Sequence, residues 1–576
     1  MSIRSHAAAL LLVAAGCGEN PSQQPAAEAE DGLNDAIITT TGKADGDLTD
    51  CQIEGALAYV NDAATTVAVL RAAGVPSRSA KNIVANRPYE SLEALDAVPY
   101  VGPITFDRVL AAAPELDCTP EPAAGTPEVI FSPKALPESH LARVASMIDA
   151  AQRSLDIAVY SFSDAGIFAA LEGAVARGVS VRMLFEPANA QHGRPEGTMS
   201  ARLEDAGVDV RYVNKIMHHK FVLVDGPRDS VEQAKAGSLA TGSGNWSNSA
   251  GTRYDENTVF LTGHAEANLR FQREFNHLWE NSRDLVWNES LTTFASLPID
   301  DAAVAAGGDD PALDAVFTSA NFEVTESRSG PGFTAVLTRN EASDRMVDMI
   351  LGATKSVRVA SGHLRSRPIA EALLAKHQQS PEVDIRVYLD GQEYLSASSH
   401  RSQVVAQEQC LADAGEDEGE RLACLEKGFL WGYAVHEAGI SVRFKLSAYR
   451  WDHSYALQMH HKYIVVDDTR VASGSYNFSE NAEHGTMENV VFYDHAGLVK
   501  TFAENFDAIW ATGETSWPTL LADVKGGGGD VPIVFAPMAL TWPQVTELKQ
   551  AIRTACPAVD SEDYRRNPGA HRVCTR

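Results

Sequence analysis

The sequence predicts an α/β fold of two pseudo-symmetric β-α-β lobes with helix-covered mixed sheets, preceded by a small all-α domain. Two features of the chain support this prediction. Apolar strands and amphipathic helices alternate in residues 127–300 and again in residues 312–524. Three polar clusters also recur in the same order in both ranges. Because 576 residues exceed what one hydrophobic core usually holds, we expect several domains.

The N-terminal 50 residues predict export rather than a folded domain. Residues 1–16 have a positive residue, an apolar core and small residues at their end, as a signal peptide does. Cys17 follows directly, and this arrangement resembles the lipobox of bacterial lipoproteins, which implies lipidation of Cys17. Residues 17–50 are acidic and poor in aromatics, so we expect a disordered tether. The protein is then a lipoprotein of the outer membrane or cell envelope, or, with plain secretion, periplasmic or secreted.

The six remaining cysteines form three local couples along the chain. In an oxidising compartment we expect the disulfides Cys51–Cys118, Cys410–Cys424 and Cys556–Cys574. Buried free thiols are the alternative. None of the cysteines has the spacing of a zinc site, and we expect neither a metal nor a cofactor.

Residues 51–118 predict two helical hairpins with turns at Gly74–Pro76 and Val101–Pro103. They resemble tandem helix-hairpin-helix modules, a family whose hairpin glycines expose backbone N–H groups to a DNA phosphate. Arg78 and Lys81 are the basic residues beside the first hairpin, so the electrostatic footprint is poor. A net charge of −29 also disfavours long-range attraction to nucleic acid. A spacer or protein-docking module and non-specific DNA binding both stay open.

Each lobe starts with the same run of elements. In the first lobe we expect strands at 129–131, 155–160 and 179–185, and helices at 141–148 and 166–176. The second repeats them with helices at 346–351 and 369–374 and strands at 357–360 and 383–389. The lobes differ by a polar loop at 227–237 and a charged, helix-forming insertion at 410–427. In the C-terminal extension, 525–576, residues 533–537 are similar to 130–133 and predict a strand that closes the fold.

The repeated polar clusters carry the chemistry. The first cluster is His-x-Lys-x-x-x-x-Asp, with His218, Lys220 and Asp225 in one copy and His460, Lys462 and Asp467 in the other. A Gly-Ser-x-Asn turn follows each copy and supplies Ser243 and Asn245, then Ser475 and Asn477. Because residues two apart on a strand share a face, each first histidine points with its lysine, and the next histidine points away.

The residue types predict a site for an anion with non-bridging oxygens. One imidazole attacks phosphorus and the other protonates the leaving oxygen. The two lysines and the two asparagines then hold the phosphoryl oxygens. Glu256 and Glu488 follow the histidine of their own half, and we expect each to fix the tautomer of that ring.

These paired motifs resemble the phospholipase D superfamily over roughly residues 129–510. The resemblance implies a bilobal, metal-independent phosphodiesterase with a phosphohistidine intermediate. By analogy His218 is the nucleophile and His460 the acid, and the reverse order stays open. It also implies catalytic roles for both lysines and both aspartates of the motif, and substrate binding by the Ser and Asn of each turn.

The substrate class is less determined than the reaction. We favour hydrolysis of phospholipids by a monomer, because the lipid anchor and the net charge suit a membrane substrate. An endonuclease acting on DNA or RNA is the close alternative, supported by the hairpin resemblance. A non-catalytic phosphate-binding lipoprotein is the alternative from another class.

Overall fold

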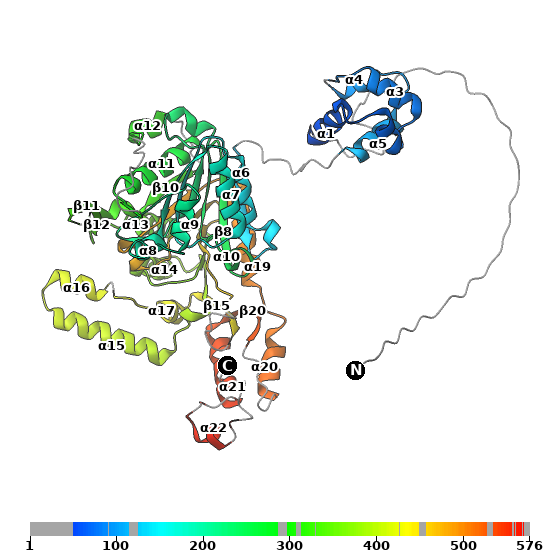
Figure 1. The fold of residues 1–576 in the computed structure, drawn as a ribbon. Coiled ribbons are helices and arrows are strands. Elements are labelled where there is room, and N and C mark those ends of the chain that lie inside the picture. Colours follow the sequence, from blue (N-terminus) through cyan, green and yellow to red (C-terminus); the bar gives the residue numbers. More distant parts are fainter. Residues whose placement is uncertain are drawn as a thin grey trace, which may run out of the picture. The chain divides into compact units, whose positions relative to one another are not determined.

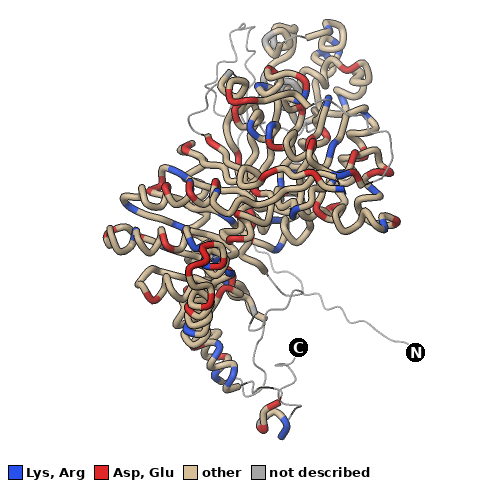
Figure 2. The backbone as a smooth tube through the Cα atoms, turned by 90° about the vertical axis from the view of Figure 1, so that its left-hand side faces the viewer, with Lys and Arg blue, Asp and Glu red and all other residues tan. Residues whose placement is uncertain are grey.

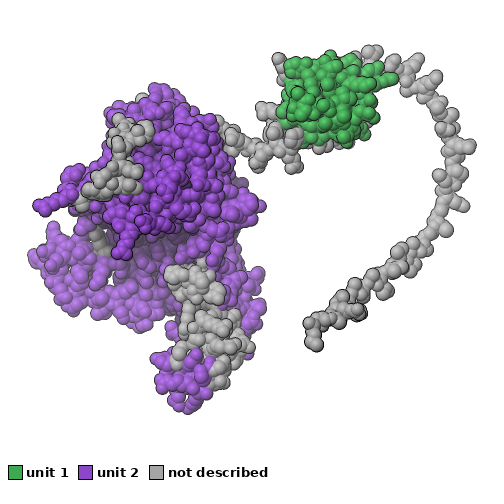
Figure 3. All heavy atoms as spheres, in the orientation of Figure 1, with its two compact units in different colours: residues 1–121 green, residues 122–576 purple. Residues whose placement is uncertain are grey.

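The computed structural model describes residues 50–89, 91–113, 125–285, 296–306, 313–328, 330–425, 427–448, 457–526, 534–555, 558, 560–566 and 568. The chain divides into two compact units, residues 1–121 and residues 122–576 (Figure 3). The predicted signal peptide, Cys17 and the tether to residue 49 lie outside the described residues. The same holds for Cys118, Cys556, Cys574 and the side chain of Cys51, so two predicted disulfides stay predictions.

The first unit is a small helical domain with a core of its own. Its helices are α1 Asp50–Asn61, α2 Val67–Ala72, α3 Ser77–Ala85, α4 Leu92–Asp96 and α5 Pro103–Ala112. Gly74 makes the α2–α3 turn with a φ of +86°, a conformation that favours glycine. The Arg108 guanidinium donates a hydrogen bond to the Gly74 carbonyl, so this cation is used within the unit. These elements match the predicted hairpins, and contact with DNA or a partner protein stays a prediction.

The first lobe is built on an eight-stranded mixed sheet with the order β1-β8-β7-β6-β2-β3-β4-β9. Its strands are β1 Glu128–Ser132, β2 Ser154–Val159, β3 Ser180–Phe185, β4 Asp209–Tyr212, β6 Lys220–Val224, β7 Ser238–Gly242, β8 Glu256–Thr262 and β9 Arg283–Asp284. The β2-β3-β4 pairs are parallel and the other pairs are antiparallel. Helices α6 His140–Ala150 and α7 Ala165–Ala176 pack on one face, and α11 Ala265–Glu280 packs on the other.

The second lobe repeats this sheet strand for strand, as β10-β19-β17-β16-β13-β14-β15-β20. Its strands are β10 Leu313–Phe317, β13 Ser356–Ser361, β14 Asp384–Asp390, β15 Ser441–Ala448, β16 Lys462–Val466, β17 Arg470–Gly474, β19 Asn489–Tyr493 and β20 Val534–Thr541. Helices α13 Glu341–Leu351 and α14 Arg367–Gln379 pack on one face, and α19 Ala496–Trp510 on the other. The predicted α/β fold of two lobes is confirmed (Figure 1).

The C-terminal boundary differs from the prediction. Strand β20 pairs with β15, so residues 534–541 belong to the second sheet rather than to a separate extension. The predicted strand exists and lies at the edge of the second sheet. The counterpart of β1 is β10, at the opposite edge of the sheet. Short apolar runs of this kind predict a strand but not its neighbour.

A shared core joins the two lobes. Buried side chains from both sheets, together with α11 and α19, form one hydrophobic cluster that includes Met217, Phe221, Met459 and Tyr463. Each lobe has a second core on its outer side, under its own helix pair. The segments that lead into β6 and β16 therefore meet at a buried interface between the two lobes, which we call the seam. Within the described ranges, no helix combines the length and the apolar character needed to cross a membrane.

Two insertions distinguish the lobes. Helices α15 Ala397–Ala414 and α16 Glu418–Leu425 lie side by side and project from the second lobe (Figure 1). The Cys410–Cys424 disulfide joins them, as the sequence predicts. The loop at 227–237 is only partly a surface loop, because Arg228 turns inward and pairs with the buried carboxylate of Asp156.

Candidate active site

The two leading histidines each pair with a glutamate from the opposite lobe. His218 Nδ1 lies 2.7 Å from Glu488 Oε1, and His460 Nδ1 lies 2.7 Å from Glu256 Oε1. Both glutamates are fully buried. The sequence-based pairing within each half is therefore wrong, because β8 and β19 carry their glutamates across the seam between the lobes. Both glutamates still face Nδ1, with a hydrogen bond in the His460–Glu256 pair and a close ion-pair contact in the His218–Glu488 pair. This arrangement leaves Nε2 of each ring as the atom available to a substrate.

The motif lysines lie in the same place. Lys220 Nζ is 2.5 Å from the carbonyl oxygen of His218, and Lys462 Nζ is 2.8 Å from that of His460. Both side chains are almost completely buried. Their charges act on one another and on both glutamates, so the four ionisable groups share one site. The structure thus brings His218, Lys220, His460 and Lys462 together.

Burial sets the protonation of this site. It lowers the pKa of Lys220 to about 7 and that of Lys462 to about 8. It also holds the pKa of His218 well below its usual range and lowers that of His460 to about 4. At neutral pH both imidazoles are therefore neutral.

The two glutamates differ in pKa. Burial raises the pKa of Glu488 to about 7, because Lys220 and its hydrogen bonds offset the desolvation only in part. Burial acts in the same direction on Glu256, but the charges of His460 and Lys462 outweigh it and lower the pKa. The Glu256–His460 pair consequently favours an ionised carboxylate more than the Glu488–His218 pair does.

The motif aspartates do not reach the histidines, which corrects their predicted catalytic role. Asp225 ends β6 with a φ of 51°, and its carboxylate accepts backbone N–H groups of residues 152–154. Asp467 has a φ of 55° and accepts the backbone N–H groups of residues 354–356. The aspartate at the end of each motif therefore stabilises the turn that precedes a neighbouring strand, β2 for Asp225 and β13 for Asp467.

The serines of the Gly-Ser-x-Asn turns hold the glutamate strands and are fully buried, which corrects their predicted contact with substrate. Ser475 Oγ donates to Glu488 Oε2 at 2.5 Å and accepts from the Asn489 backbone N–H at 3.0 Å. Ser243 Oγ accepts the Asn257 backbone N–H at 2.9 Å and contributes to lowering the pKa of Glu256. Both serines therefore act on the histidines through the glutamates.

The glycine of each turn is required by close packing. A Cβ atom on Gly242 would lie 2.2 Å from the Asn257 carbonyl oxygen, and one on Gly474 would lie 2.1 Å from that of Asn489. The turn asparagines, Asn245 and Asn477, are half-buried. Asn245 Oδ1 is buried and has no hydrogen-bond partner among the described residues, which leaves this amide available to a ligand.

The second histidine of each motif belongs to the seam between the lobes. His219 is fully buried, with Nδ1 3.0 Å from Asn489 Nδ2 and Nε2 3.2 Å from Glu274 Oε1. His461 is equally buried, with Nδ1 3.3 Å from Asn257 Oδ1. Their side chains lie away from the lysines, as the alternation along a strand predicts.

Sequence reasoning missed two acidic residues that position the histidine segments. Glu186 accepts the backbone N–H of Met217 at 2.6 Å, and Asp390 accepts that of Met459 at 2.9 Å. Glu186 directly follows β3 and Asp390 is the last residue of β14. The two acids have the same place in the repeat, and this is the signal that could have found them.

Tyr160 is a further residue that the sequence did not single out. Its ring packs edge-on against His218, with centroids 4.7 Å apart, and Lys220 Nζ lies 5.0 Å from its centroid. The second lobe has Gly362 at this position, where a Cβ would lie 2.9 Å from the Met459 carbonyl oxygen. This difference agrees with the exposure of the histidines, since the His218 side chain is 8% exposed and that of His460 is 19% exposed.

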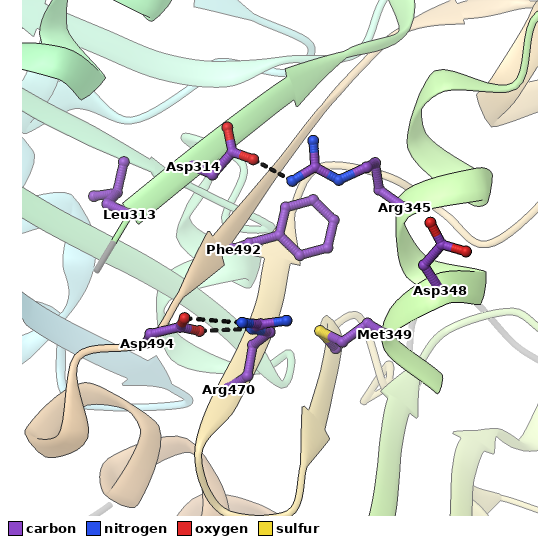
Figure 4. A pocket seen from close by; sticks show the side chains of 8 residues that line it. All are labelled: Leu313, Asp314, Arg345, Asp348, Met349, Arg470, Phe492 and Asp494. Atoms are coloured by element: carbon purple, nitrogen blue, oxygen red, sulfur yellow. Dashed lines mark hydrogen bonds and ion pairs between the residues drawn. The ribbon is translucent and has the colours of Figure 1, made fainter. Parts of the chain in front are cut away.

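Other charged groups lie apart from this constellation. A hollow of about 310 Å³ at the edge of the second sheet is lined by Arg345, Arg470, Asp314 and Asp494, which form ion pairs with one another across Phe492 (Figure 4). Glu204, Asp209 and Asp284 gather near β4 and β9 and are the acidic group among the described residues that could hold a cation. None of these residues contacts the histidines or lysines.

A family model described as "Cardiolipin synthase, PLD-like domain" matches residues 144–279 and 346–510, together more than half of the chain. The chain belongs to the phospholipase D superfamily. The two matched ranges contain both histidine–lysine motifs and both glutamates, so the family assignment rests on each of the two lobes.

Several proteins are similar to these phospholipase D-like lobes. The mitochondrial cardiolipin hydrolase of Danio rerio is 36% identical over 77 residues, which are 13% of this chain and 31% of the relative. That of Xenopus laevis is 31% identical over 171 residues, 30% of this chain and 62% of the relative. The solved structure of Nuc, a phospholipase D family member from Salmonella typhimurium, is 19% identical with a TM-score of 0.21, covering 34% of this chain and 95% of Nuc. The chain thus spans less than two thirds of the length of both curated relatives.

The phospholipase D-like site brings two imidazoles and two ammonium groups together. Each imidazole is held from behind by a glutamate, and neither lysine has a carboxylate within ion-pairing distance among the described residues. Such a set can bind an anion and provide both a nucleophile and a proton donor.

Proposed function

We propose that this protein is a phospholipase D-type phosphodiesterase that hydrolyses phospholipids through a phosphohistidine intermediate. The observation that carries the proposal is the pair of Glu–His dyads that face one another across the lobes with two buried lysines between them. A site for anion binding alone needs neither two oriented imidazoles nor two glutamates to orient them.

The geometry supports a two-step displacement. The Nε2 atom of His218 attacks phosphorus, and the bond between phosphorus and the leaving oxygen breaks as His460 donates a proton to that oxygen. His460 then takes a proton from water, which attacks the phosphohistidine and releases His218. Lys220 and Lys462 stabilise the negative charge that grows on the non-bridging oxygens. Substrate charge raises the proton affinity of His460, whose pKa in the free enzyme is about 4.

A phospholipid substrate is supported by the relatives and by charge. The two curated relatives described above are cardiolipin hydrolases by name. The chain has a net charge of −29, and acidic and basic residues alternate along the backbone in the view of Figure 2. A long polyanion such as DNA is therefore less favoured than a single phosphodiester at a lipid surface.

The experiment compares substrates without a metal. Purified protein is incubated in EDTA with labelled phosphatidylcholine, cardiolipin, single-stranded DNA and double-stranded DNA, with His460→Ala as the matched control. We expect release of phospholipid headgroup or phosphatidic acid by the wild type, and none by the variant. DNA cleavage without lipid cleavage would favour the endonuclease, and inactivity on all four with phosphate binding would favour the binding protein.

We also propose that the protein is exported and anchored by a lipid on Cys17, which places the site beside a membrane. The signal-like residues 1–16 and the position of Cys17 directly after them support this location. The tether of residues 17–50 is long enough to let the catalytic unit reach lipid headgroups.

A further inference from the structure

The repeat is broken at one buried pair of residues beside the active site. Asp255 in the first lobe and Lys445 in the second form an ion pair of 2.7 Å, with side chains 9% and 4% exposed. Buried ion pairs are costly to desolvate and add little stability over apolar side chains of similar size. A retained one next to a reaction centre therefore calls for an explanation other than stability.

The register of the two sheets identifies the counterparts of this pair. Asp255 bridges Met459 as Met487 bridges Met217, so Asp255 corresponds to Met487. Lys445 lies beside Asp390 in the register of β14 and β15, and the same register in the first lobe places Val213 beside Glu186. Val213 and Met487 are both buried in the inner core. One half therefore has an ion pair where the other half has two apolar side chains.

The ion pair holds the segment that carries His460. The Asp255 carbonyl accepts the His460 backbone N–H at 3.0 Å, and the Asp255 N–H donates to the Gln458 carbonyl at 2.9 Å. Lys445 Nζ donates to that same Gln458 carbonyl at 3.3 Å. Asp255 also directly precedes Glu256, which bonds the ring of His460. In the first lobe the His218 backbone N–H donates to the Met487 carbonyl at 3.1 Å, and the apolar Met487 side chain has no counterpart of this ion pair.

The chemistry needs two different histidines. The nucleophile must attack as a neutral imidazole, whereas the proton donor must carry a positive charge when the leaving oxygen departs. A polar, charged neighbourhood favours a carboxylate–imidazolium pair, and an apolar one favours the neutral form.

We propose that Asp255 and Lys445 are positioning residues that make His460 the proton-handling histidine and leave His218, beside Val213 and Met487, as the nucleophile. This inference rests on the proposed phosphodiesterase function. It goes beyond it by naming the residues that divide the roles between two otherwise equivalent halves.

The test is the double variant Asp255→Met with Lys445→Val. It gives the His460 half the apolar residue types that Met487 and Val213 provide in the His218 half. Two phosphodiesters are compared in single-turnover formation of the phosphoenzyme, one with an alkoxide leaving group and one with 4-nitrophenolate. The alkoxide needs a proton as it leaves, and 4-nitrophenolate does not. We expect a loss of about tenfold or more for the alkoxide, and a change within about threefold for 4-nitrophenolate.

A merely structural role predicts equal losses on both substrates, and that result would overturn the inference, as would no loss on either. Asp255→Asn, which keeps the side-chain shape, gives the same comparison if the double variant does not fold. The surface pair Lys525–Glu547, 2.8 Å apart, is the control, and Lys525→Met with Glu547→Gln should alter neither rate. If the wild type hydrolyses neither phosphodiester, the proposed function fails; a wild type active on both, with equal losses in the variant, contradicts this inference alone.

Discussion

The carboxylate of Glu488 in the second lobe lies 2.7 Å from Nδ1 of His218 in the first lobe, and burial raises the pKa of Glu488 to about 7. Each half of the active site thus depends on the other half for the orientation of its imidazole. Neither lobe alone holds a complete histidine–glutamate pair, so docking of the two lobes is a requirement for catalysis.

The pH profile should report this pair. Below pH 7 Glu488 becomes protonated and loses the carboxylate charge that lies beside His218 Nδ1, so activity falls as pH falls. Above pH 7 Lys220 loses the charge that holds the phosphoryl oxygens, so activity falls as pH rises. We predict a bell-shaped dependence of kcat/KM with both limbs near pH 7. Glu488→Gln should remove the acid limb of the pH profile. The matched variant Glu256→Gln should slow the reaction but retain the acid limb. An unchanged acid limb in Glu488→Gln would contradict the assignment.

The two histidines of each motif should separate in their effects. His218→Ala and His460→Ala should each lower turnover by several powers of ten, because in the proposed mechanism one is the nucleophile and the other the proton donor. The two losses should not add, since both act in one reaction. His219→Ala should instead lower the free energy of unfolding by about 1–3 kcal/mol, because it empties a buried hydrogen-bonded site.

Single-turnover rates and denaturant unfolding on these three variants check that separation. His461→Ala serves as the matched control in the second lobe, where the ring is equally buried. A folded His219→Ala protein as inactive as His218→Ala would show that the second histidine acts on the substrate.

The motif aspartates should affect stability rather than chemistry. Asp225→Ala leaves backbone N–H groups of residues 152–154 without their acceptor, and we expect a loss of about 1–3 kcal/mol in the free energy of unfolding. Asp225→Asn keeps an acceptor and tolerates the positive φ, so its loss should be smaller. Urea unfolding gives the stability, and initial rates per folded molecule should stay near the wild-type value. A large fall in that rate would place Asp225 in the reaction.

Tyr160 should act through its ring. Tyr160→Phe keeps the contacts with His218 and Lys220, so we expect a rate within about twofold of the wild type. Tyr160→Ala removes both contacts and should cost about tenfold in kcat/KM, roughly 1.4 kcal/mol. The measurement is steady-state kinetics on both variants. Equal losses in the two would assign the role to the hydroxyl instead.

The membrane anchor is tested by one substitution. Cys17→Ser removes the thiol that a lipid would modify, so the protein should move from the membrane fraction to the soluble fraction while its activity on a water-soluble phosphodiester stays unchanged. Fractionation followed by mass spectrometry of the N-terminal peptide measures both. A wild type that is already soluble and unmodified would remove the lipoprotein assignment.

The sequence by itself determined the duplication, the α/β class and the groups that meet at the site. Two copies of a histidine and a lysine two residues apart must present these side chains on one face, because alternation along an extended chain is a local property. The same rule placed His219 and His461 on the opposite side, where both are buried.

Only the tertiary structure decided which groups bond one another. Glu256 follows His218 in the chain and yet holds His460, because the start of β8 lies against the Met459–His460 segment of the second lobe. The carboxylate of Asp225 accepts backbone N–H groups, and the hydroxyl of Ser475 donates to Glu488. These contacts form because buried donors need acceptors wherever the packing places them. Distances along a chain do not encode contacts between lobes, and so the pairing of Asp255 with Lys445 had no signal in the sequence.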